Sequence, residues 1–119
     1  MQNYNIIMYQ KNGEKPVERF LHGLNVKTKA RAMRMIKILK DNGTRLREPY
    51  SKSLGDGIFE LRIQQGNDRA RILYFFMHGN NIVLTNGFVK KTQKTPNKEL
   101  EKAKRYRKVF LEKGVNYER

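Results

Sequence analysis

The sequence predicts an α+β fold: an N-terminal strand, a helical hairpin, an antiparallel β-meander and a C-terminal helix. Apolar, β-rich runs at residues 58–66, 69–77 and 82–91 are separated only by short polar loops, which is typical of antiparallel hairpins. Two amphipathic helical patterns precede these runs, and one more follows them. The resulting order of β, α, α, β, β, β, α keeps strands and helices in blocks, as in α+β proteins.

Length and charge limit the classes of protein to consider. The 119 residues fit one domain, which we expect to span residues 1–119. Lys and Arg number 26 against 11 Asp and Glu, a formal net charge of +15. Such an excess destabilises the free chain by self-repulsion, and it is typical of proteins that bind nucleic acid, an anionic membrane or an acidic protein.

The N-terminal part predicts one strand and two helices. Residues 4–9 form a β candidate that we expect to pair with the meander. Pro16 suits the start of a helix that ends at Gly23, and Asn25 can cap a second helix that runs through Asp41. The apolar stripe expected on this second helix is Val26, Ala30, Met33, Ile36 and Leu39.

Two segments flank the meander. Residues 44–57, with Pro49 and two glycines, read as a connector. After the meander, Thr95-Pro96 predicts the start of a final helix. The basic run 98–113 on this helix fits either a solvated charged face or a contact with nucleic acid or the ribosome.

Alternation along the first two strands of the meander separates an apolar face from a charged one. Glu60 and Arg62 lie opposite the apolar odd-numbered residues of the first strand, and Arg69 and Arg71 lie opposite the apolar even-numbered residues of the second. This face is interpreted either as a phosphate clamp, since guanidinium binds phosphate in a bidentate manner, or as a solvated surface where Glu60 pairs with Arg62. The basic residues gathered here are Arg62, Arg69, Arg71, Lys90 and Lys91.

Several classes of site and location fit the sequence poorly. The chain has no cysteine, and neither His22 nor His78 has a second ligand at metal-binding spacing, so we expect no metal site and no cofactor. The polar start of the chain predicts no signal peptide, and no apolar run approaches membrane-spanning length. We therefore expect a cytoplasmic protein without a membrane role.

Three stretches resemble a known group of proteins. They are Leu54-Gly-Asp-Gly-Ile-Phe-Glu-Leu-Arg62, Arg71-Ile-Leu-Tyr74 and, most specifically, Phe88-Val-Lys-Lys-Thr-Gln-Lys-Thr-Pro96. Together they resemble phage-derived HigB-like toxins of the RelE/ParE superfamily, and the match covers nearly the whole chain. The resemblance implies a RelE-like fold and the toxin half of a type II toxin–antitoxin pair. It also implies a metal-independent endoribonuclease that cuts mRNA on the ribosome, restrained by an acidic helix-turn-helix antitoxin.

The resemblance also implies which residues form the site. Arg62 and Arg71 match basic residues of the RelE-type site, Lys90 or Lys91 matches the basic residue after the last strand, and Glu60 stands where RelE carries lysine. Glu60 is a candidate general base, or else it orients Arg62. The expected catalytic set is Arg62, Arg71, Lys90, Lys91 and Glu60, and the expected RNA contacts are Arg69, Lys94, Thr92, Lys52 and Lys98.

Two other functions remain open at the level of sequence. A ParE-like poison of DNA gyrase shares the fold but binds a protein and cleaves nothing itself. A non-catalytic module that binds RNA or the ribosome would need only the positive charge. The arginines of the sheet face, with Lys90 and Lys91, favour the nuclease over the gyrase poison.

Overall fold

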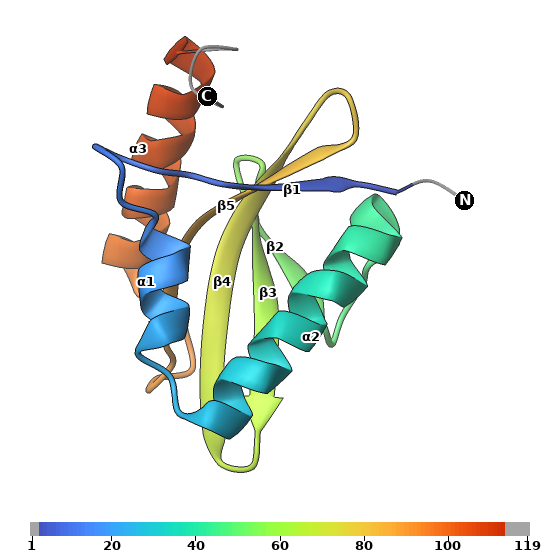
Figure 1. Ribbon diagram of the computed structural model, residues 1–119, viewed down its shortest axis with the longest axis vertical. Helices are drawn as coiled ribbons and strands as arrows, with labels where there is room; N and C mark the ends of the chain where they lie inside the picture. Colours follow the sequence, from blue (N-terminus) through green and yellow to red (C-terminus); the bar gives the residue numbers. More distant parts are fainter. Residues whose placement is uncertain (1–2, 114–119) are drawn as a thin grey trace.

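A five-stranded sheet in the order β1-β5-β4-β3-β2 organises the computed structural model, which describes residues 3–113 (Figure 1). Strands β2 to β5 form an antiparallel meander, and β1 pairs in parallel with β5. This arrangement confirms the α+β prediction and the pairing of the N-terminal strand. The strands are β1 (Asn5–Met8), β2 (Ser51–Gly55), β3 (Ile58–Gln65), β4 (Asp68–Met77) and β5 (Asn81–Val89). The helices are α1 (Pro16–His22), α2 (Val26–Asn42), the 3-10 turn η1 (Gly43–Arg45) and α3 (Asn97–Lys113).

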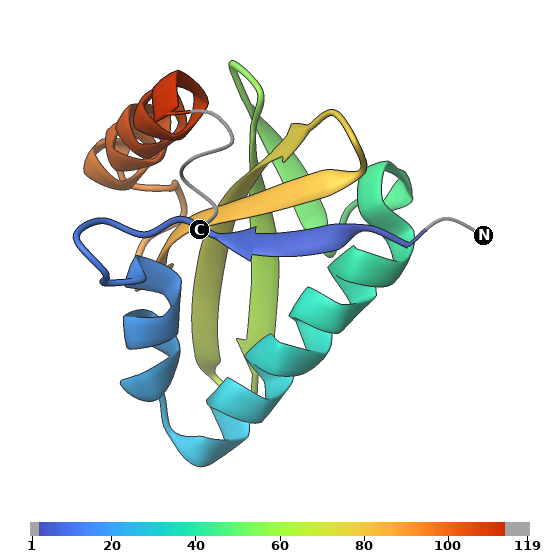
Figure 2. The same cartoon turned by 45° about the horizontal axis from the view of Figure 1, so that its top comes forward.

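Helices cover the sheet on both faces (Figures 1 and 2). On one face α1 and α2 pack against side chains such as Leu61, Ile72 and Leu84, all fully buried. On the other face Ala103 and Phe110 of α3 pack against a second apolar cluster from β3, β4 and β5. The charged alternation predicted for the meander therefore faces α3. None of the helices within residues 3–113 is long and apolar enough to cross a membrane.

The interpretation of residues 44–57 as a connector was wrong, because they contain η1 and the edge strand β2. Strand β2 consists mainly of serine, lysine and glycine, so it carries little β propensity of its own. Pairing with β3 stabilises it instead. The two-residue turn between these strands has positive φ at both Asp56 (53°) and Gly57 (80°), as a type I′ hairpin turn requires.

The predicted apolar stripe of α2 was wrong in its first half. Val26 is 84% exposed and Met33 is 49% exposed, whereas Thr28 and Ala32 are buried. A polar contact explains this rotation of the helix. Thr28 Oγ1 donates a hydrogen bond to Asp68 Oδ2 at 3.1 Å, at the start of β4. The cap residue Asn25 donates to the same oxygen at 3.0 Å, so this side of α2 turns toward the sheet.

These positions give a test of the packing. Ile72→Val should lower the free energy of unfolding by about 0.5–1.5 kcal/mol, because it removes one methylene from a fully buried side chain. Val26→Ala should change the stability by less than about 0.5 kcal/mol, since the side chain is exposed. Urea denaturation of the two variants measures both values. A loss at Val26 as large as that at Ile72 would contradict the orientation of α2.

Candidate active site

A carboxylate surrounded by three cations lies between the sheet and the segment that leads into α3. Glu60 is 1% exposed. Its Oε1 atom lies 3.6 Å from Arg62 Nε and 3.7 Å from Arg71 Nε, and its Oε2 atom lies 4.0 Å from Lys90 Nζ. Four of the five predicted catalytic residues therefore meet at one point. We call Glu60, Arg62, Arg71 and Lys90 the Glu60 cluster.

The geometry of the sheet explains why these residues meet. Arg62 on β3 and Arg71 on β4 are direct cross-strand partners, and such like-charged pairs repel each other. Glu60 lies two residues before Arg62, so it shares their face and supplies the opposite charge. Lys90 follows the end of β5, where its backbone N–H donates to the carbonyl of Arg69 at 2.8 Å. The period of two along the strands thus places all four side chains on the α3 side.

The interpretation of this face as a solvated surface was wrong about its exposure, although the expected pair of Glu60 and Arg62 is present. Arg71 is 7% exposed and Lys90 is 8% exposed, and within the Glu60 cluster only Arg62 keeps a substantial solvent-facing surface, with 27% of its side chain exposed. The enclosure comes from the segment before α3, because Thr95 Oγ1 donates a hydrogen bond to Glu60 Oε2. The sequence predicted Thr95 only as part of the start of the final helix, and Thr95 was not among the predicted site residues.

The contacts of α3 with the sheet fix this enclosing segment. Asn86 of β5 donates through Nδ2 to Glu99 Oε1 at 3.0 Å and to the Glu99 carbonyl at 3.2 Å, in the first turn of α3. Farther along, Lys104 Nζ lies 3.0 Å from Asp56 Oδ2 in the β2–β3 turn. Arg107 donates to the Asp56 carbonyl, and its guanidinium carbon lies 5.7 Å from the centre of the Phe75 ring. These contacts hold both halves of α3 on the sheet.

Burial and like charge act together on the cations of the cluster. Burial lowers the pKa of Arg71, and although Glu60 opposes this shift, Arg62 and Arg69 add to it. The pKa of Lys90 is lowered mainly by burial as well, with Glu60 opposing and the neighbouring arginines reinforcing the shift. One carboxylate therefore faces an excess of positive charge in a partly desolvated place. An anion bound beside Arg62 would relieve this excess.

Two donors of the cluster are not used within the described structure. The Nε atoms of Arg62 and Arg71 are enclosed, and neither has a hydrogen-bond partner among residues 3–113. Both face Glu60 at distances longer than the usual 2.7–3.2 Å for such a bond. Buried donors of this kind usually have a hydrogen-bond partner, so these two N–H groups are available to a further acceptor such as a bound anion.

The other predicted residues surround the cluster without joining it. Lys91 is exposed, so Lys90 and not Lys91 provides the buried ammonium group. Thr92 Oγ1 donates to the carbonyl of Lys94 at 2.8 Å, which shapes an exposed basic loop over residues 91–94. Lys52 is the cross-strand partner of Glu60 on the edge strand β2. The structure places Arg69 half-buried on β4 and Lys98 exposed in the first turn of α3.

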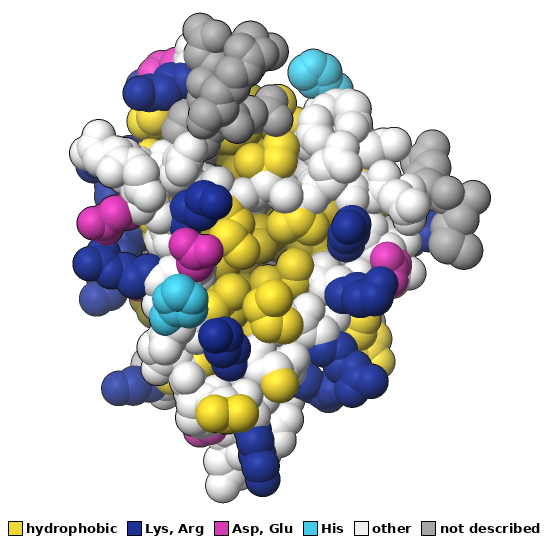
Figure 3. Space-filling view, in the orientation of Figure 1, with side chains coloured by type: hydrophobic (Ala, Val, Ile, Leu, Met, Phe, Trp, Pro, Cys, Tyr) yellow, Lys and Arg dark blue, Asp and Glu magenta, His cyan; other side chains and the backbone are white. Residues whose placement is uncertain are grey.

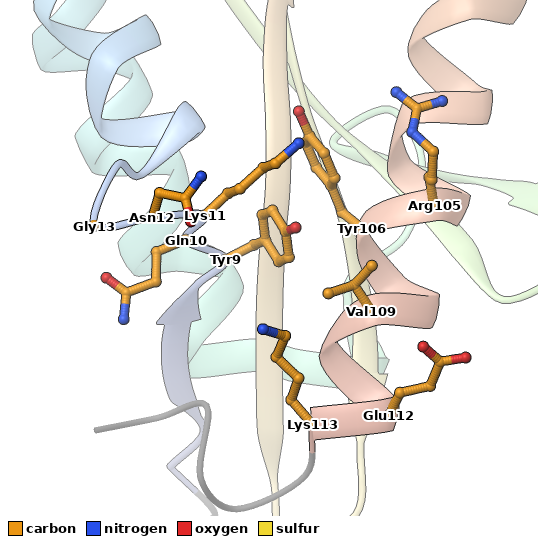
Figure 4. Close-up of a pocket in the computed structure, with 10 residues that line it drawn as sticks. All are labelled: Tyr9, Gln10, Lys11, Asn12, Gly13, Arg105, Tyr106, Val109, Glu112 and Lys113. Atoms are coloured by element: carbon orange, nitrogen blue, oxygen red, sulfur yellow. The ribbon is translucent and has the colours of Figure 1, made fainter.

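Another cavity lies away from this cluster, between residues 9–13 and α3 (Figure 4). It measures about 770 Å³, and the rings of Tyr9 and Tyr106 stack in it at a centroid distance of 4.2 Å. Burial, with the neighbouring Tyr106, raises the pKa of Tyr9, so this phenol stays protonated near neutral pH. Across residues 3–113, no group of three His, Cys, Asp or Glu side chains could hold a metal ion. The Glu60 cluster, with its buried carboxylate and three cations, is the candidate site for chemistry.

Comparison with known proteins places the chain in a family. The family model for phage-derived Gp49-like proteins matches residues 19–108, which include the whole meander and the Glu60 cluster. No curated protein matches the chain. The matched segment runs from α1 through most of α3 and so contains every element that positions the cluster. The chain belongs to the Gp49-like family of phage-derived proteins, a family associated with RelE-like and toxin–antitoxin proteins.

Proposed function

We propose that this protein is the toxin of a type II toxin–antitoxin pair and a HigB-like endoribonuclease that cuts mRNA on the ribosome in the cytoplasm. The observation that carries the proposal is the Glu60 cluster, in which three cations surround one buried carboxylate and one of the three, Arg62, is partly exposed to solvent. Membership of the Gp49-like family supports a toxin-like role. The net charge of +15 supports a polyanionic substrate.

The proposed reaction needs only groups of the RNA and of this chain. The ribose 2′-oxygen attacks the adjacent phosphorus, the bond from phosphorus to O5′ breaks, and the 2′-hydroxyl proton leaves as O5′ gains one. The products are a 2′,3′-cyclic phosphate and a 5′-hydroxyl end. Arg62 binds a phosphoryl oxygen, because it is the most exposed cation of the cluster. Arg71 is its cross-strand partner on the same face and would add to the positive potential felt by the charge that develops in the transition state.

Glu60 and Lys90 are both buried, but their contacts and the pKa of Lys90 suit them to different roles. Glu60 is held by Thr95 and faces the cations, so we assign it the positioning of Arg62 and Arg71, not the removal of the 2′-hydroxyl proton. Because the pKa of Lys90 is lowered, a larger fraction of this side chain is the neutral amine at a given pH than for an ordinary lysine. A lysine tuned in this way suits proton transfer, so Lys90 is our candidate for moving a proton at the leaving or attacking oxygen.

Mapping of the RNA ends tests this chemistry directly. Message recovered from a translation reaction with the purified protein should carry 2′,3′-cyclic phosphate and 5′-hydroxyl ends at the cuts. The same message without ribosomes is the control and should stay intact. Cuts that leave a 3′-hydroxyl and a 5′-phosphate would contradict the proposed attack by the ribose oxygen. Inhibition of gyrase supercoiling without any cuts would favour the ParE-like alternative.

RNA binding should depend strongly on salt. The surface expected to bind RNA phosphates comprises Arg62, Arg69, Lys91, Lys94 and Lys98. If about five phosphates are contacted, log K should fall with log salt at a slope of roughly −3 to −4 on single strands. Fluorescence anisotropy with a labelled RNA at several salt concentrations measures the slope.

Two exposed loop lysines test this prediction residue by residue, and a lysine on α2 serves as the control. Lys91→Ala and Lys94→Ala should each flatten the slope by about 0.7, since each removes one phosphate contact. Lys37, which pairs with Asp41 on α2 at 3.3 Å, is a matched surface position away from the proposed path. Lys37→Ala should leave the slope unchanged. A slope near zero for the wild-type protein would contradict a role in binding RNA.

The proposed partner is an acidic antitoxin with a helix-turn-helix domain. Figure 3 shows hydrophobic side chains at the surface between α1 and α2, with Lys and Arg side chains around them. The apolar side chains of such a partner would cover the hydrophobic surface, and its acidic side chains would relieve the repulsion among the surrounding Lys and Arg residues. Coexpression with the neighbouring reading frames should yield a copurifying small protein that restores growth. If no neighbouring product binds or rescues growth, the toxin–antitoxin proposal loses its main support.

A further inference from the structure

A second, smaller cavity lies at the β2 edge of the sheet, on the face that α2 covers. It measures about 270 Å³ and is bounded by η1, the segment after η1, strand β2 and three aromatic side chains. The rings of Phe59 and Tyr74 are stacked at 5.6 Å with an interplanar angle of 21°. Phe76 meets both rings edge-on, at 5.3 Å and 5.6 Å. Phe59 and Phe76 are only partly buried, so part of this aromatic wall is open.

Polar and charged side chains also line the cavity. Ser51 Oγ and the Tyr74 hydroxyl share a hydrogen bond at its wall. Burial raises the pKa of Tyr74, so its hydroxyl keeps its proton near neutral pH. Arg47 and Lys52 contribute positive charge to the lining. The wall is thus aromatic, carries hydroxyl groups, and has cations available for a phosphate backbone.

The cavity and the Glu60 cluster lie on opposite faces of the sheet, and two residues at the β2 edge link them. Glu48 lines the cavity, and its Oε1 atom lies 3.9 Å from Arg62 Nη1. Lys52 also lines the cavity and is the cross-strand partner of Glu60. Because β2 is the edge strand next to β3, a bound strand that extends from Arg62 reaches this cavity by passing over β2 alone. No other described cavity shares lining residues with the contacts of the cluster.

We propose that this cavity binds an unpaired nucleobase of the RNA strand whose phosphate Arg62 holds. The inference rests on the proposed function and adds to it a base-binding subsite outside the reacting phosphate. The base would stack on the open part of the Phe59–Phe76 wall, while Ser51 and Tyr74 stay buried behind it in their mutual hydrogen bond. Single-stranded nucleic acids are commonly bound in this way, by aromatic stacking beside a positively charged track.

An abasic scan tests the subsite. A labelled single-stranded RNA of about 12 nucleotides is prepared with one abasic position at a time, and its binding is measured by fluorescence anisotropy. For the wild-type protein, one abasic position should weaken binding by about tenfold, since stacking of one base contributes that much or more. In Phe76→Leu, the same position should have no special effect. A profile that is flat for the wild-type protein, or no binding of single-stranded RNA at all, would overturn the proposal.

A matched variant and a second measurement control for folding. Phe20→Leu makes the same change at another partly buried phenylalanine, which lies on α1 and outside this cavity, and it should keep the wild-type abasic profile. If Phe76→Leu does not fold, stacking can be measured with the wild-type protein and an RNA that carries the fluorescent base 2-aminopurine at the sensitive position. Its fluorescence should be quenched on binding, and unchanged fluorescence would overturn the proposal.

The experiment separates this subsite from the nuclease activity. The same preparations are assayed for cuts in ribosome-bound message. Cuts together with a flat abasic profile would overturn the subsite and leave the proposed function standing. A position-specific abasic effect without cuts would leave the subsite standing and overturn the nuclease. If Phe76→Leu keeps the abasic profile and instead loses binding to a protein partner, the cavity is a protein-docking site and the proposal is wrong.

Discussion

Glu60→Gln is expected to lower the free energy of unfolding by about 3–5 kcal/mol, because it removes one partner of a buried charge cluster. Glu60 is 1% exposed and is the carboxylate nearest to Arg71 and Lys90 in the described ion pairs. Without its charge, these buried cations and Arg62 would repel one another with no compensation. The amide can still accept the hydrogen bond from Thr95, so the substitution isolates the charge. Urea denaturation monitored by circular dichroism measures the loss.

A second substitution provides the control. Lys90→Met in the Glu60→Gln background should recover part of the lost stability, since it removes one of the uncompensated cations while keeping much of the side-chain volume. Lys90→Met alone should cost much less than Glu60→Gln, because burial already disfavours the charged lysine. Equal denaturation midpoints for the wild-type and Glu60→Gln proteins would mean that Glu60 does not hold the cluster together.

Arg62→Ala is expected to reduce the cleavage rate by about 10²–10³-fold, the usual effect of losing one preorganised contact to the transition state. Its stability should stay near that of the wild-type protein, since 27% of the side chain is exposed and its removal relieves repulsion with Arg71. The rate is measured on ribosome-bound message, and growth arrest at equal expression gives the same comparison in cells.

Arg19→Ala is the matched control for this substitution. Arg19 is also paired with a glutamate, at 3.0 Å, but its side chain is 79% exposed and lies on α1 away from the cluster. The Arg19→Ala protein should cleave RNA at the wild-type rate. Wild-type activity of Arg62→Ala, or an equal loss in Arg19→Ala, would remove Arg62 from the catalytic site.

The sequence predicted the meander well because the period of two is a local property. Glu60, Arg62 and Arg71 were assigned to one face from alternation alone, and the cross-strand register confirms this assignment. The edge strand β2 was missed because its serines and glycine resemble a loop. The Asp56-Gly57 pair was the available signal, since Asp-Gly between two strands favours a type I′ hairpin turn.

The rotation of α2 and the burial of the charged face could not be read from local pattern. Val26 and Met33 fit a helical stripe as well as Thr28 and Ala32 do, and the bond from Thr28 to Asp68 links residues forty positions apart. The enclosure of Glu60 depends in the same way on where α3 packs, and a basic helix gives little indication of its packing face. Lys90 and Lys91 both follow the same strand, so the sequence pattern does not show which of them is buried.

Primer extension on message from an in vitro translation reaction tests the central claim most directly. The wild-type protein should produce discrete cuts that require ribosomes, and Arg62→Ala at equal concentration should produce cuts about 10²–10³-fold more slowly. Arg19→Ala should reproduce the wild-type pattern. A full-length message with the wild-type protein, under conditions in which it arrests growth, would contradict the account that the Glu60 cluster cleaves RNA.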